Sequence, residues 1–278
     1  MTPPRAWRLG YATAGFARTP DLASVLPRIR DAGFAGVEIA IGPPHVRLRE
    51  PWTPSGKEAR AMLDRTGLEA VVGAGARHAL GPVPHEPALA SADAAERAAR
   101  LAFLERCLDW AADAGVSVVT AHSGPLPEGQ DPREGWKHFR EGMERAASRA
   151  RERGLVFALE WHPAMLVGSF ADWQRAAHEV PGLALALDVG HAQCTEEGPL
   201  PAFVASVAPL AAYIQLEDIR GRRHVHLPIG EGEIPFGAVF AALDRAGYAG
   251  LVTAEFHSGA IERDEGELCK ETKRKLES

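Results

Sequence analysis

Near its middle the chain reads Arg151-Glu152-Arg153-Gly154-Leu155-Val156-Phe157-Ala158-Leu159-Glu160. The charged helical segment ends at Gly154, because a glycine just past a helix end adopts the left-handed conformation at little cost. The apolar run that follows is continuous rather than alternating, which is typical of a parallel strand buried on both faces. A carboxylate, Glu160, closes the run. A helix end, a buried strand and an acidic residue therefore follow one another directly.

The same join recurs along the whole chain. Glycines that end a helical pattern are Gly33, Gly67, Gly115, Gly154, Gly182 and Gly247. We expect strands to begin near Trp7, Gly36, Leu68, Ser117, Leu155, Leu183, Ala212 and Gly250. Eight strand–helix units in 278 residues most simply close into a barrel. The prediction is an α/β fold in which residues 1–278 form a single (β/α)8 TIM-barrel domain, with the active site at the C-terminal ends of the strands.

A doubly wound open sheet is the competing fold. Dinucleotide-binding sheets of that kind carry Gly-x-Gly-x-x-Gly after their first strand. Here the corresponding stretch reads Leu9-Gly10-Tyr11-Ala12-Thr13-Ala14-Gly15, which lacks the pattern. The barrel is therefore preferred.

Composition narrows the class of protein. Hydrophobic residues make up 46% and charged residues 24%, which is typical of a soluble globular chain, and no apolar run approaches the length of a membrane span. The three scattered cysteines and the lack of an apparent signal peptide favour a cytoplasmic location. The net charge of −6, without a basic block before the C-terminal tail, argues against nucleic-acid binding. The eleven histidines are the one unusual count.

Polar residues stand where the predicted strands end, and barrels of this type place their active sites there. They are His122, Glu160, Asp188, His191, Gln215, His224, His226 and Glu255. A carboxylate directly after an apolar strand is partly buried, and burial of a charge costs several kcal/mol unless the charge is paired or binds a metal. Three such carboxylates converging from the fifth, sixth and eighth strands indicate one divalent cation. Oxygen ligands with one imidazole suit Mn²⁺, Mg²⁺, Co²⁺ or Zn²⁺.

The order of these motifs resembles one family. The motifs are Leu159-Glu160, Leu187-Asp188-Val189-Gly190-His191, Gln215-Leu216-Glu217-Asp218, His226-Leu227-Pro228-Ile229-Gly230-Glu231-Gly232 and Ala254-Glu255. The chain resembles the xylose isomerase-like TIM barrels, a group of sugar and sugar phosphate isomerases and epimerases related to the endonuclease IV-like enzymes. The resemblance implies that Glu160, Asp188, a residue of the seventh strand and Glu255 bind the metal.

The seventh strand departs from the family pattern, because Gln215 stands where a histidine is expected. An amide oxygen can bind a hard divalent ion, which favours Mg²⁺ or Mn²⁺ over Zn²⁺. Alternatively His226 takes over as the fourth ligand.

The resemblance implies a metal-dependent isomerase or epimerase that acts on a small keto-sugar, sugar phosphate or cyclitol through an enediolate. Glu160 and Glu255 would move the proton, and His191 would polarise or protonate a substrate oxygen. The residues expected to line the substrate pocket are His122, His226, Glu38 and Arg222, with Arg223 as an alternative to Arg222. A buried ion pair is the equally weighted alternative for Glu38. His162 and His257 are interpreted as loop histidines, and the irregular stretch 75–87 as either a lid or a stiff surface loop.

Two further reactions remain open. A metal-dependent dehydratase or lyase of the dehydroshikimate or inosose type shares the enediolate step, and some dehydroshikimate dehydratases of this superfamily also use glutamine on the seventh strand. An endonuclease IV-like nuclease is less favoured, because His224 and Gln215 replace residues expected there. The expected partner is a small polyol or keto-sugar, and a homo-oligomer is possible. The sequence decides neither the substrate nor the metal.

Overall fold

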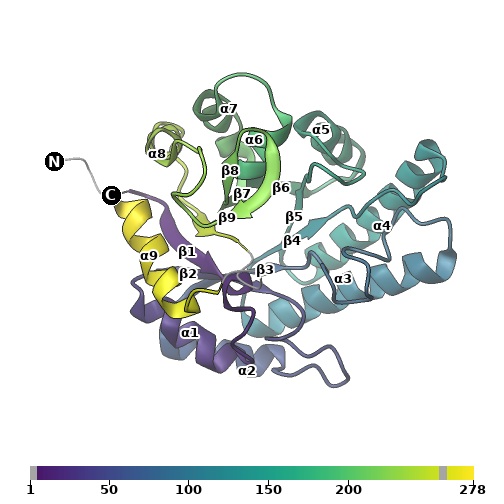
Figure 1. Ribbon diagram of the computed structural model, residues 1–278. Helices are drawn as coiled ribbons and strands as arrows, with labels where there is room; N and C mark the ends of the chain where they lie inside the picture. Colours follow the sequence, from purple (N-terminus) through teal and green to yellow (C-terminus); the bar gives the residue numbers. More distant parts are fainter. Residues whose placement is uncertain (1–4, 257–261) are drawn as a thin grey trace.

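The computed structural model describes residues 5–256 and 262–278. The strands of its main sheet are β1 Arg8–Ala12, β2 Gly36–Ala40, β3 Glu69–Gly73, β4 Val118–His122, β5 Val156–Glu160, β6 Leu183–Asp188, β7 Ala211–Leu216 and β10 Leu251–Ala254. They are parallel and close into a barrel in the order β1-β10-β7-β6-β5-β4-β3-β2 (Figure 1). Each strand begins within one residue of its predicted position, and the predicted (β/α)8 barrel is confirmed.

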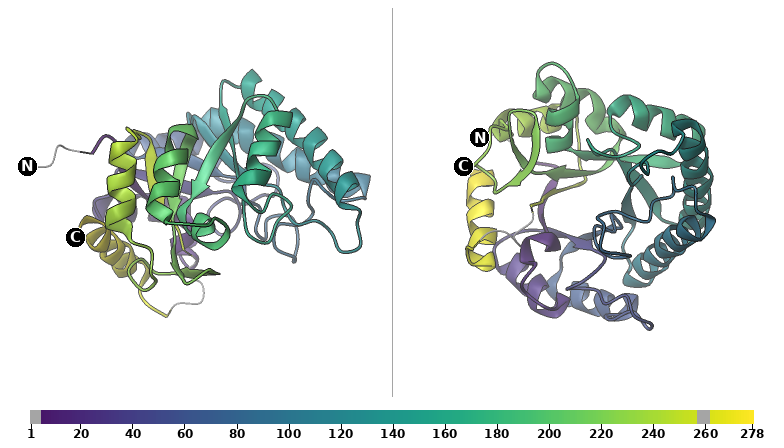
Figure 2. Two further views of the ribbon diagram at one scale, coloured as in Figure 1. Left: turned by 90° about the horizontal axis from the view of Figure 1, so that it is seen from above. Right: turned by 45° about the vertical axis from the view of Figure 1, so that its right-hand side comes forward.

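Helices surround the barrel on its outside (Figure 2). The α-helices are α1 Leu22–Asp31, α2 Gly56–Thr66, α3 Ala94–Ala114, α4 Pro132–Glu152, α5 Phe170–Glu179, α6 Val189–Thr195, α7 Leu200–Val207, α8 Phe236–Arg245 and α9 Glu265–Glu277. Two 3-10 turns, η1 Thr13–Phe16 and η2 Ala208–Leu210, connect to them. Gly67 and Gly115 end α2 and α3 with φ of 66° and 72°, as the sequence predicts. Among the described residues, none of the helices combines the length and apolar character needed to cross a membrane.

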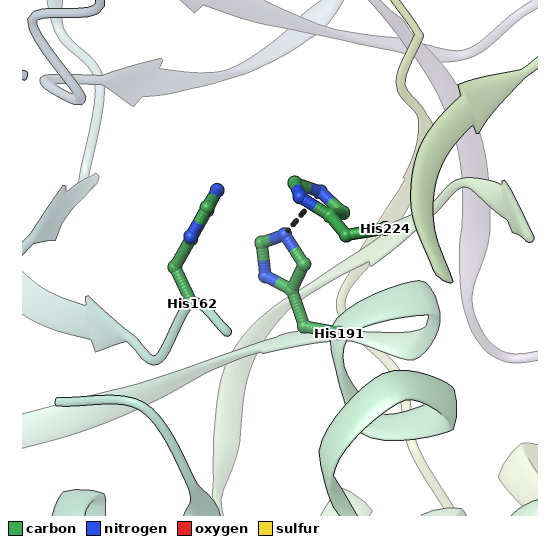
Figure 3. Close-up of side chains that lie close together, drawn as sticks. All are labelled: His162, His191 and His224. Carbon is green, nitrogen blue, oxygen red and sulfur yellow. Dashed lines mark hydrogen bonds between the residues drawn. The ribbon is translucent and has the colours of Figure 1, made fainter. Parts of the chain in front are cut away.

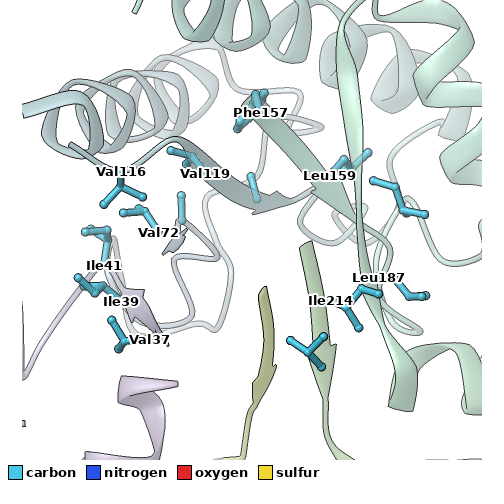
Figure 4. Close-up of a cluster of buried hydrophobic side chains, with 14 of the residues drawn as sticks. Val37, Ile39, Ile41, Val72, Val116, Val119, Phe157, Leu159, Leu187 and Ile214 are labelled. Carbon is cyan, nitrogen blue, oxygen red and sulfur yellow. The ribbon is translucent and has the colours of Figure 1, made fainter. Parts of the chain in front are cut away.

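Side chains alternate between the two faces of each barrel strand. In β5, Phe157 and Leu159 belong to the large core between the strands and the helices, which Figure 4 shows. Ala158 instead belongs to a second cluster that fills the barrel interior. The interior cluster consists of Val71, Ala158, Ala186, Tyr213 and Leu251. Both faces are buried, which explains the continuous apolar runs, and polar residues take over the inward positions toward the C-terminal ends.

A short antiparallel hairpin follows β7, formed by β8 Asp218–Arg220 and β9 Arg223–Leu227. This hairpin was not predicted, since the motif Gln215-Leu216-Glu217-Asp218 reads as part of the seventh strand. The structure divides that motif, because Gln215 lies in β7, Glu217 follows the end of β7 and Asp218 begins β8. The period of two along β9 puts His224 and His226 on the same face.

Candidate active site

The barrel strands place polar side chains inside the barrel near its C-terminal end. Glu38 of β2, Glu160 of β5, Asp188 of β6 and Gln215 of β7 are all buried. Glu255 directly follows β10 and is partly buried. These residues come together because the C-terminal ends of parallel strands share one rim of a barrel.

Gln215 connects two of these carboxylates. Its Nε2 donates to Oε2 of Glu38 at 2.9 Å and to Oε2 of Glu255 at 2.5 Å. Carboxylates only accept hydrogen bonds, so the amide nitrogen must face them and Oε1 must face elsewhere. Oε1 of Gln215 is buried and has no hydrogen-bond partner among the described residues. Tyr213 supports the arrangement, because its hydroxyl donates to Oε2 of Glu38 at 2.8 Å.

Glu160 is held between two histidines. Its Oε1 lies 2.9 Å from Nδ1 of His191, and its Oε2 lies 3.0 Å from Nε2 of His122. Asp188 serves as the N-cap of α6, since its Oδ1 accepts a hydrogen bond from the backbone N–H of His191 at 2.8 Å. The strand β6 therefore passes into α6 without a loop, which fixes His191 relative to Asp188.

The carboxylates differ in their tendency to ionise. Burial opposes ionisation of Glu160 most strongly, but the contacts with His122 and His191 outweigh it and hold its pKa below the ordinary value. Burial, followed by repulsion from Glu38, raises the pKa of Glu255 well above its ordinary value. Burial, followed by repulsion from Glu217, raises the pKa of Asp188 in the same way. Burial also raises the pKa of Glu38 to about 7.

These residues fit a divalent metal. Ligand atoms of Glu160, Asp188 and His191 all lie within 4.8 Å of one another. The unpartnered Oε1 of Gln215 adds a neutral oxygen donor. The described contacts of the carboxylates come from histidine, tyrosine, amide and backbone groups rather than from lysine or arginine, so a cation would relieve their mutual repulsion. Glu255, the fourth predicted ligand, reaches this group through Gln215.

Histidine side chains form a continuous cluster at the same end of the barrel. Neighbouring rings have centroids 4.6 to 5.8 Å apart, and Figure 3 shows three of them. The cluster consists of His85, His122, His162, His191, His224 and His226. His85 comes from the stretch 75–87, whose irregular course was the only sequence signal for it. His162, interpreted as a loop histidine, lies in the middle of the cluster, and His257 lies outside the described residues.

Glu217, in the motif Gln215-Leu216-Glu217-Asp218, is a site residue for which no role was predicted. Its side chain is fully buried. Oε1 lies 3.3 Å from Nε2 of His224 and 3.6 Å from Nε2 of His191, and Oε2 contacts Nδ1 of His226. Burial opposes its ionisation, but the contacts with His224 and His226 outweigh this effect and lower its pKa. The available signal was its spacing, because positions 215 and 217 share one face of a strand.

Arg222 and the glycine turn after β9 lie outside the buried group of carboxylates and Gln215. Arg222, predicted to contact substrate, is exposed at the turn between β8 and β9, and its guanidinium donates to the carbonyl of Glu196. The carboxylate of Asp218 accepts hydrogen bonds from the backbone N–H groups of Gly230 and Gly232. The glycine turn after β9 is therefore bound internally.

Comparison with known proteins agrees with this geometry. The chain is 26% identical over 254 residues to the L-ribulose-5-phosphate 3-epimerase UlaE of Shigella boydii, a match that covers 88% of this chain and 86% of that protein. The corresponding enzyme of Salmonella paratyphi C matches to the same extent. The predicted class, an isomerase or epimerase of a small sugar, is confirmed by these relatives.

A solved L-ribulose 3-epimerase has the same fold. It superposes with a TM-score of 0.78 at 22% identity and covers 98% of this chain and 95% of that one. The D-psicose 3-epimerase of Clostridium cellulolyticum H10, solved with D-tagatose, gives 0.75 at 18% identity, with 97% and 98% covered. The single domain, the cytoplasmic location and the homo-oligomer stay predictions. A model of the xylose isomerase-like TIM barrel family matches residues 26–277, and the chain belongs to that family.

Proposed function

We propose that this chain is a metal-dependent epimerase that inverts the carbon next to the carbonyl group of a small ketose or ketose phosphate. One observation carries the proposal: Glu160 and Glu255 approach the barrel interior from strands three positions apart in a ring of eight. Epimerisation needs two groups on different faces of one carbon, one to remove the proton and the other to return it.

The two carboxylates would divide the proton transfer between them. Glu160 would accept the proton from carbon on one side. Glu255, which enters from β10, would deliver a proton to the other face. In the reverse direction the two residues exchange these tasks. Gln215 keeps Oε2 of Glu255 in place, so the proton would be carried on Oε1.

The remaining predicted residues would bind and orient the substrate. Nδ1 of His191 faces Glu160, and its Nε2 lies 3.1 Å from Nε2 of His224. In the protonated ring, Nε2 would donate to a substrate oxygen that takes the place of this contact. His122, through its contact with Glu160, and Glu38, through Gln215, lie beside the acid–base pair. His226, at the end of the histidine cluster, would line the outer part of the pocket. Arg222 would have to leave the carbonyl of Glu196 to reach a substrate.

The proposed ligands of one metal ion are Glu160, Asp188, Gln215 and Glu255. A set made of oxygen donors favours Mn²⁺ or Mg²⁺, with Co²⁺ or Zn²⁺ as weaker candidates. When bound, the ion would supply Lewis acidity to the substrate's carbonyl and neighbouring hydroxyl oxygens.

Solvent deuterium exchange tests the reaction. Each candidate ketose, with and without phosphate, is incubated in D₂O with the Mn²⁺-loaded protein, and NMR monitors deuterium at the carbon next to the carbonyl. We expect one substrate to exchange and to yield its epimer. Glu160→Gln and Glu255→Gln should reduce turnover by at least about 100-fold, in keeping with typical general acid–base contributions. An unsaturated product would assign dehydration, and full activity in both variants would refute the two-carboxylate mechanism.

Metal content provides a second test. Gln215→Ala should lower the Mn²⁺ content of the purified protein, measured by elemental analysis. His178→Gln, on the outer helix α5, is the matched control and should keep the full content. An unchanged content in Gln215→Ala would exclude the amide as a ligand.

A further inference from the structure

We propose that Glu38 is a positioning residue, which holds the amide group of Gln215 in the orientation that turns Oε1 toward Asp188 and a bound cation. Glu38 acts through Gln215 rather than by contact with the substrate, and this role rests on the metal binding proposed above. The orientation of the amide group is a property of the metal-free protein as well, so it can be observed without metal and without turnover.

The hydrogen bond between Glu38 and Gln215 crosses the interior of the barrel. In the ring of strands, β1 and β10 lie between β2, which carries Glu38, and β7, which carries Gln215. Both side chains are buried, and Nε2 of Gln215 donates to Oε2 of Glu38 at 2.9 Å. A hydrogen bond to a carboxylate is stronger than one between neutral groups. The contact therefore ties together two strands that are not neighbours.

The contact of Gln215 with Glu255 does not by itself fix the amide group. A glutamine amide can turn its nitrogen or its oxygen toward a neighbour, and the neighbour's hydrogen-bonding capacity decides between the two. Nε2 of Gln215 lies 2.5 Å from Oε2 of Glu255. A carboxyl group that carries a proton could instead donate to the amide oxygen. A second acceptor is needed to hold the nitrogen on this side.

Oε2 of Glu38 is that acceptor. The hydroxyl of Tyr213 donates to it at 2.8 Å, and the same hydroxyl contacts Oγ1 of Thr253. Because a hydroxyl has a single hydrogen, a Tyr213 that donates to Glu38 accepts from Thr253. The hydrogen of Tyr213 already points at Oε2, so this oxygen can only accept, and Gln215 must present its nitrogen to it.

The neighbouring strand β3 leaves room for this carboxylate. A Cβ added to Gly73 would overlap with Oε1 of Glu38 and displace the carboxylate. The contacts of Glu38 among the described residues are with a tyrosine and an amide rather than with lysine or arginine. In that part of the chain Glu38 therefore forms no ion pair, and its carboxylate serves as an acceptor.

The amide oxygen of Gln215 is left on the side of β6. β7 lies between β10 and β6, and Gln215 stands opposite Asp188 in the register of β6 and β7. Oε1 of Gln215 is buried without a hydrogen-bond partner among the described residues. An amide oxygen beside a carboxylate brings acceptors together, and a divalent cation bound by both would satisfy them. A flipped amide would donate to Asp188 and remove one oxygen ligand.

The Mn²⁺ affinity of the metal-free full chain, measured by calorimetry, is the first test. Glu38→Leu removes the acceptor, and we expect Mn²⁺ to bind about 10- to 100-fold more weakly, the usual loss when the partner of a metal ligand is removed. Glu38→Gln keeps an acceptor oxygen and should recover most of this loss. Glu265→Gln, which alters a buried carboxylate on α9, is the matched control and should keep the wild-type affinity.

A double variant separates orientation from charge. If Glu38 acts through Gln215, Glu38→Leu should change the Mn²⁺ affinity by no more than about 2-fold in a chain that already carries Gln215→Ala. A full loss in that background would overturn the proposal, as would Glu38→Gln that binds as weakly as Glu38→Leu. Circular dichroism checks folding. Gly73→Ala retains the charge of Glu38 but displaces its carboxylate, so it should weaken Mn²⁺ binding even if Glu38→Leu fails to fold.

NMR of the glutamine side chains observes the orientation directly. The chain has glutamines only at positions 130, 174, 193 and 215, so ¹⁵N labelling of these side chains gives one amide signal pair for each. Gln215→Ala identifies the pair of Gln215. In the metal-free wild type, donation to two carboxylates should shift both hydrogens of this pair downfield. Glu38→Leu should move one of them back and leave the other three pairs unchanged, and an unchanged Gln215 pair would overturn the proposal.

Failure of the proposed function has a different signature. A wild type that binds no Mn²⁺ contradicts the proposed metal site, and the amide signals then decide whether Glu38 holds Gln215. A wild type that binds Mn²⁺ as tightly as Glu38→Leu does contradicts only the role of Glu38.

Discussion

Asp218 should determine how firmly the hairpin β8–β9 and the turn after it are held. Its Oδ1 accepts hydrogen bonds from the N–H groups of Ile219 at 3.0 Å and Ile234 at 3.2 Å. Its Oδ2 accepts from Gly230 at 2.8 Å and Gly232 at 2.9 Å. One buried carboxylate thus satisfies four backbone donors that come from both ends of residues 219–234.

The size of the effect follows from these four bonds. Asp218→Ala leaves two buried donors and two partly buried donors without their acceptor. At about 1–3 kcal/mol for each buried unsatisfied group, the free energy of unfolding should fall by about 4 kcal/mol. Asp218→Asn keeps one acceptor oxygen, but its new amide group faces two N–H donors. We expect that variant to lose about 2 kcal/mol.

Urea unfolding followed by circular dichroism measures both changes. With a slope of about 3 kcal/mol per molar urea, the midpoint should fall by roughly 1.3 M for Asp218→Ala and 0.7 M for Asp218→Asn. Asp31→Asn, at the exposed end of α1, is the control and should stay within about 0.5 kcal/mol of wild type. If Asp218→Asn is as stable as that control, the four hydrogen bonds do not hold the turn.

Three other outcomes are expected. Burial is the main cause that lowers the pKa of His45 below its ordinary value, so the unfolded chain binds more protons below about pH 6.5 and the free energy of unfolding falls on acidification. His45→Gln should therefore lose less stability than wild type between pH 7.5 and 5.5 in urea unfolding. An unchanged dependence of stability on pH would contradict this. Gly190→Ala should lower the free energy of unfolding by about 1–3 kcal/mol, because the added Cβ would lie 2.2 Å from Cγ of Glu217, whereas Gly237→Ala, which meets no atom within 4 Å, should gain about 0.4–1 kcal/mol. Equal stability of the two variants in urea unfolding would rule out the steric effect. Removal of metal by a chelator should lower the midpoint of thermal unfolding, and added Mn²⁺ should restore that midpoint, because a cation that binds only the folded state stabilises the folded state. An unchanged midpoint would mean that the buried carboxylates hold no metal.

The barrel could be predicted because its signals are local. Gly67 and Gly115 adopt the positive φ angles that end their helices, and the apolar runs after such glycines form the strands. Glu160 and Asp188 were recognisable as site residues because each ends an apolar run. These features need only a few neighbouring residues to be read.

The contacts around Glu217 could not be predicted because they depend on a turn in the chain. The hairpin folds His224 and His226 back over Glu217. A seventh strand that continued to residue 218 would not bring these two histidines to Glu217. Arg222 illustrates the same limit. Its sequence position near the rim says nothing about its direction, and in the fold its guanidinium reaches the carbonyl of Glu196.

The direct passage from β6 into α6 has a consequence for how specificity in this pocket can change. Asp188 is both the last residue of β6 and the N-cap of α6. An insertion there would separate Asp188 from His191, break their hydrogen bond and remove the cap of the helix. This side of the pocket is therefore a fixed wall. The stretch 75–87 contributes His85 to the histidine cluster and has an irregular course, and such loops tolerate changes of length better than strand–helix junctions do. Libraries aimed at new substrates should therefore diversify that stretch and leave residues 188–191 unchanged.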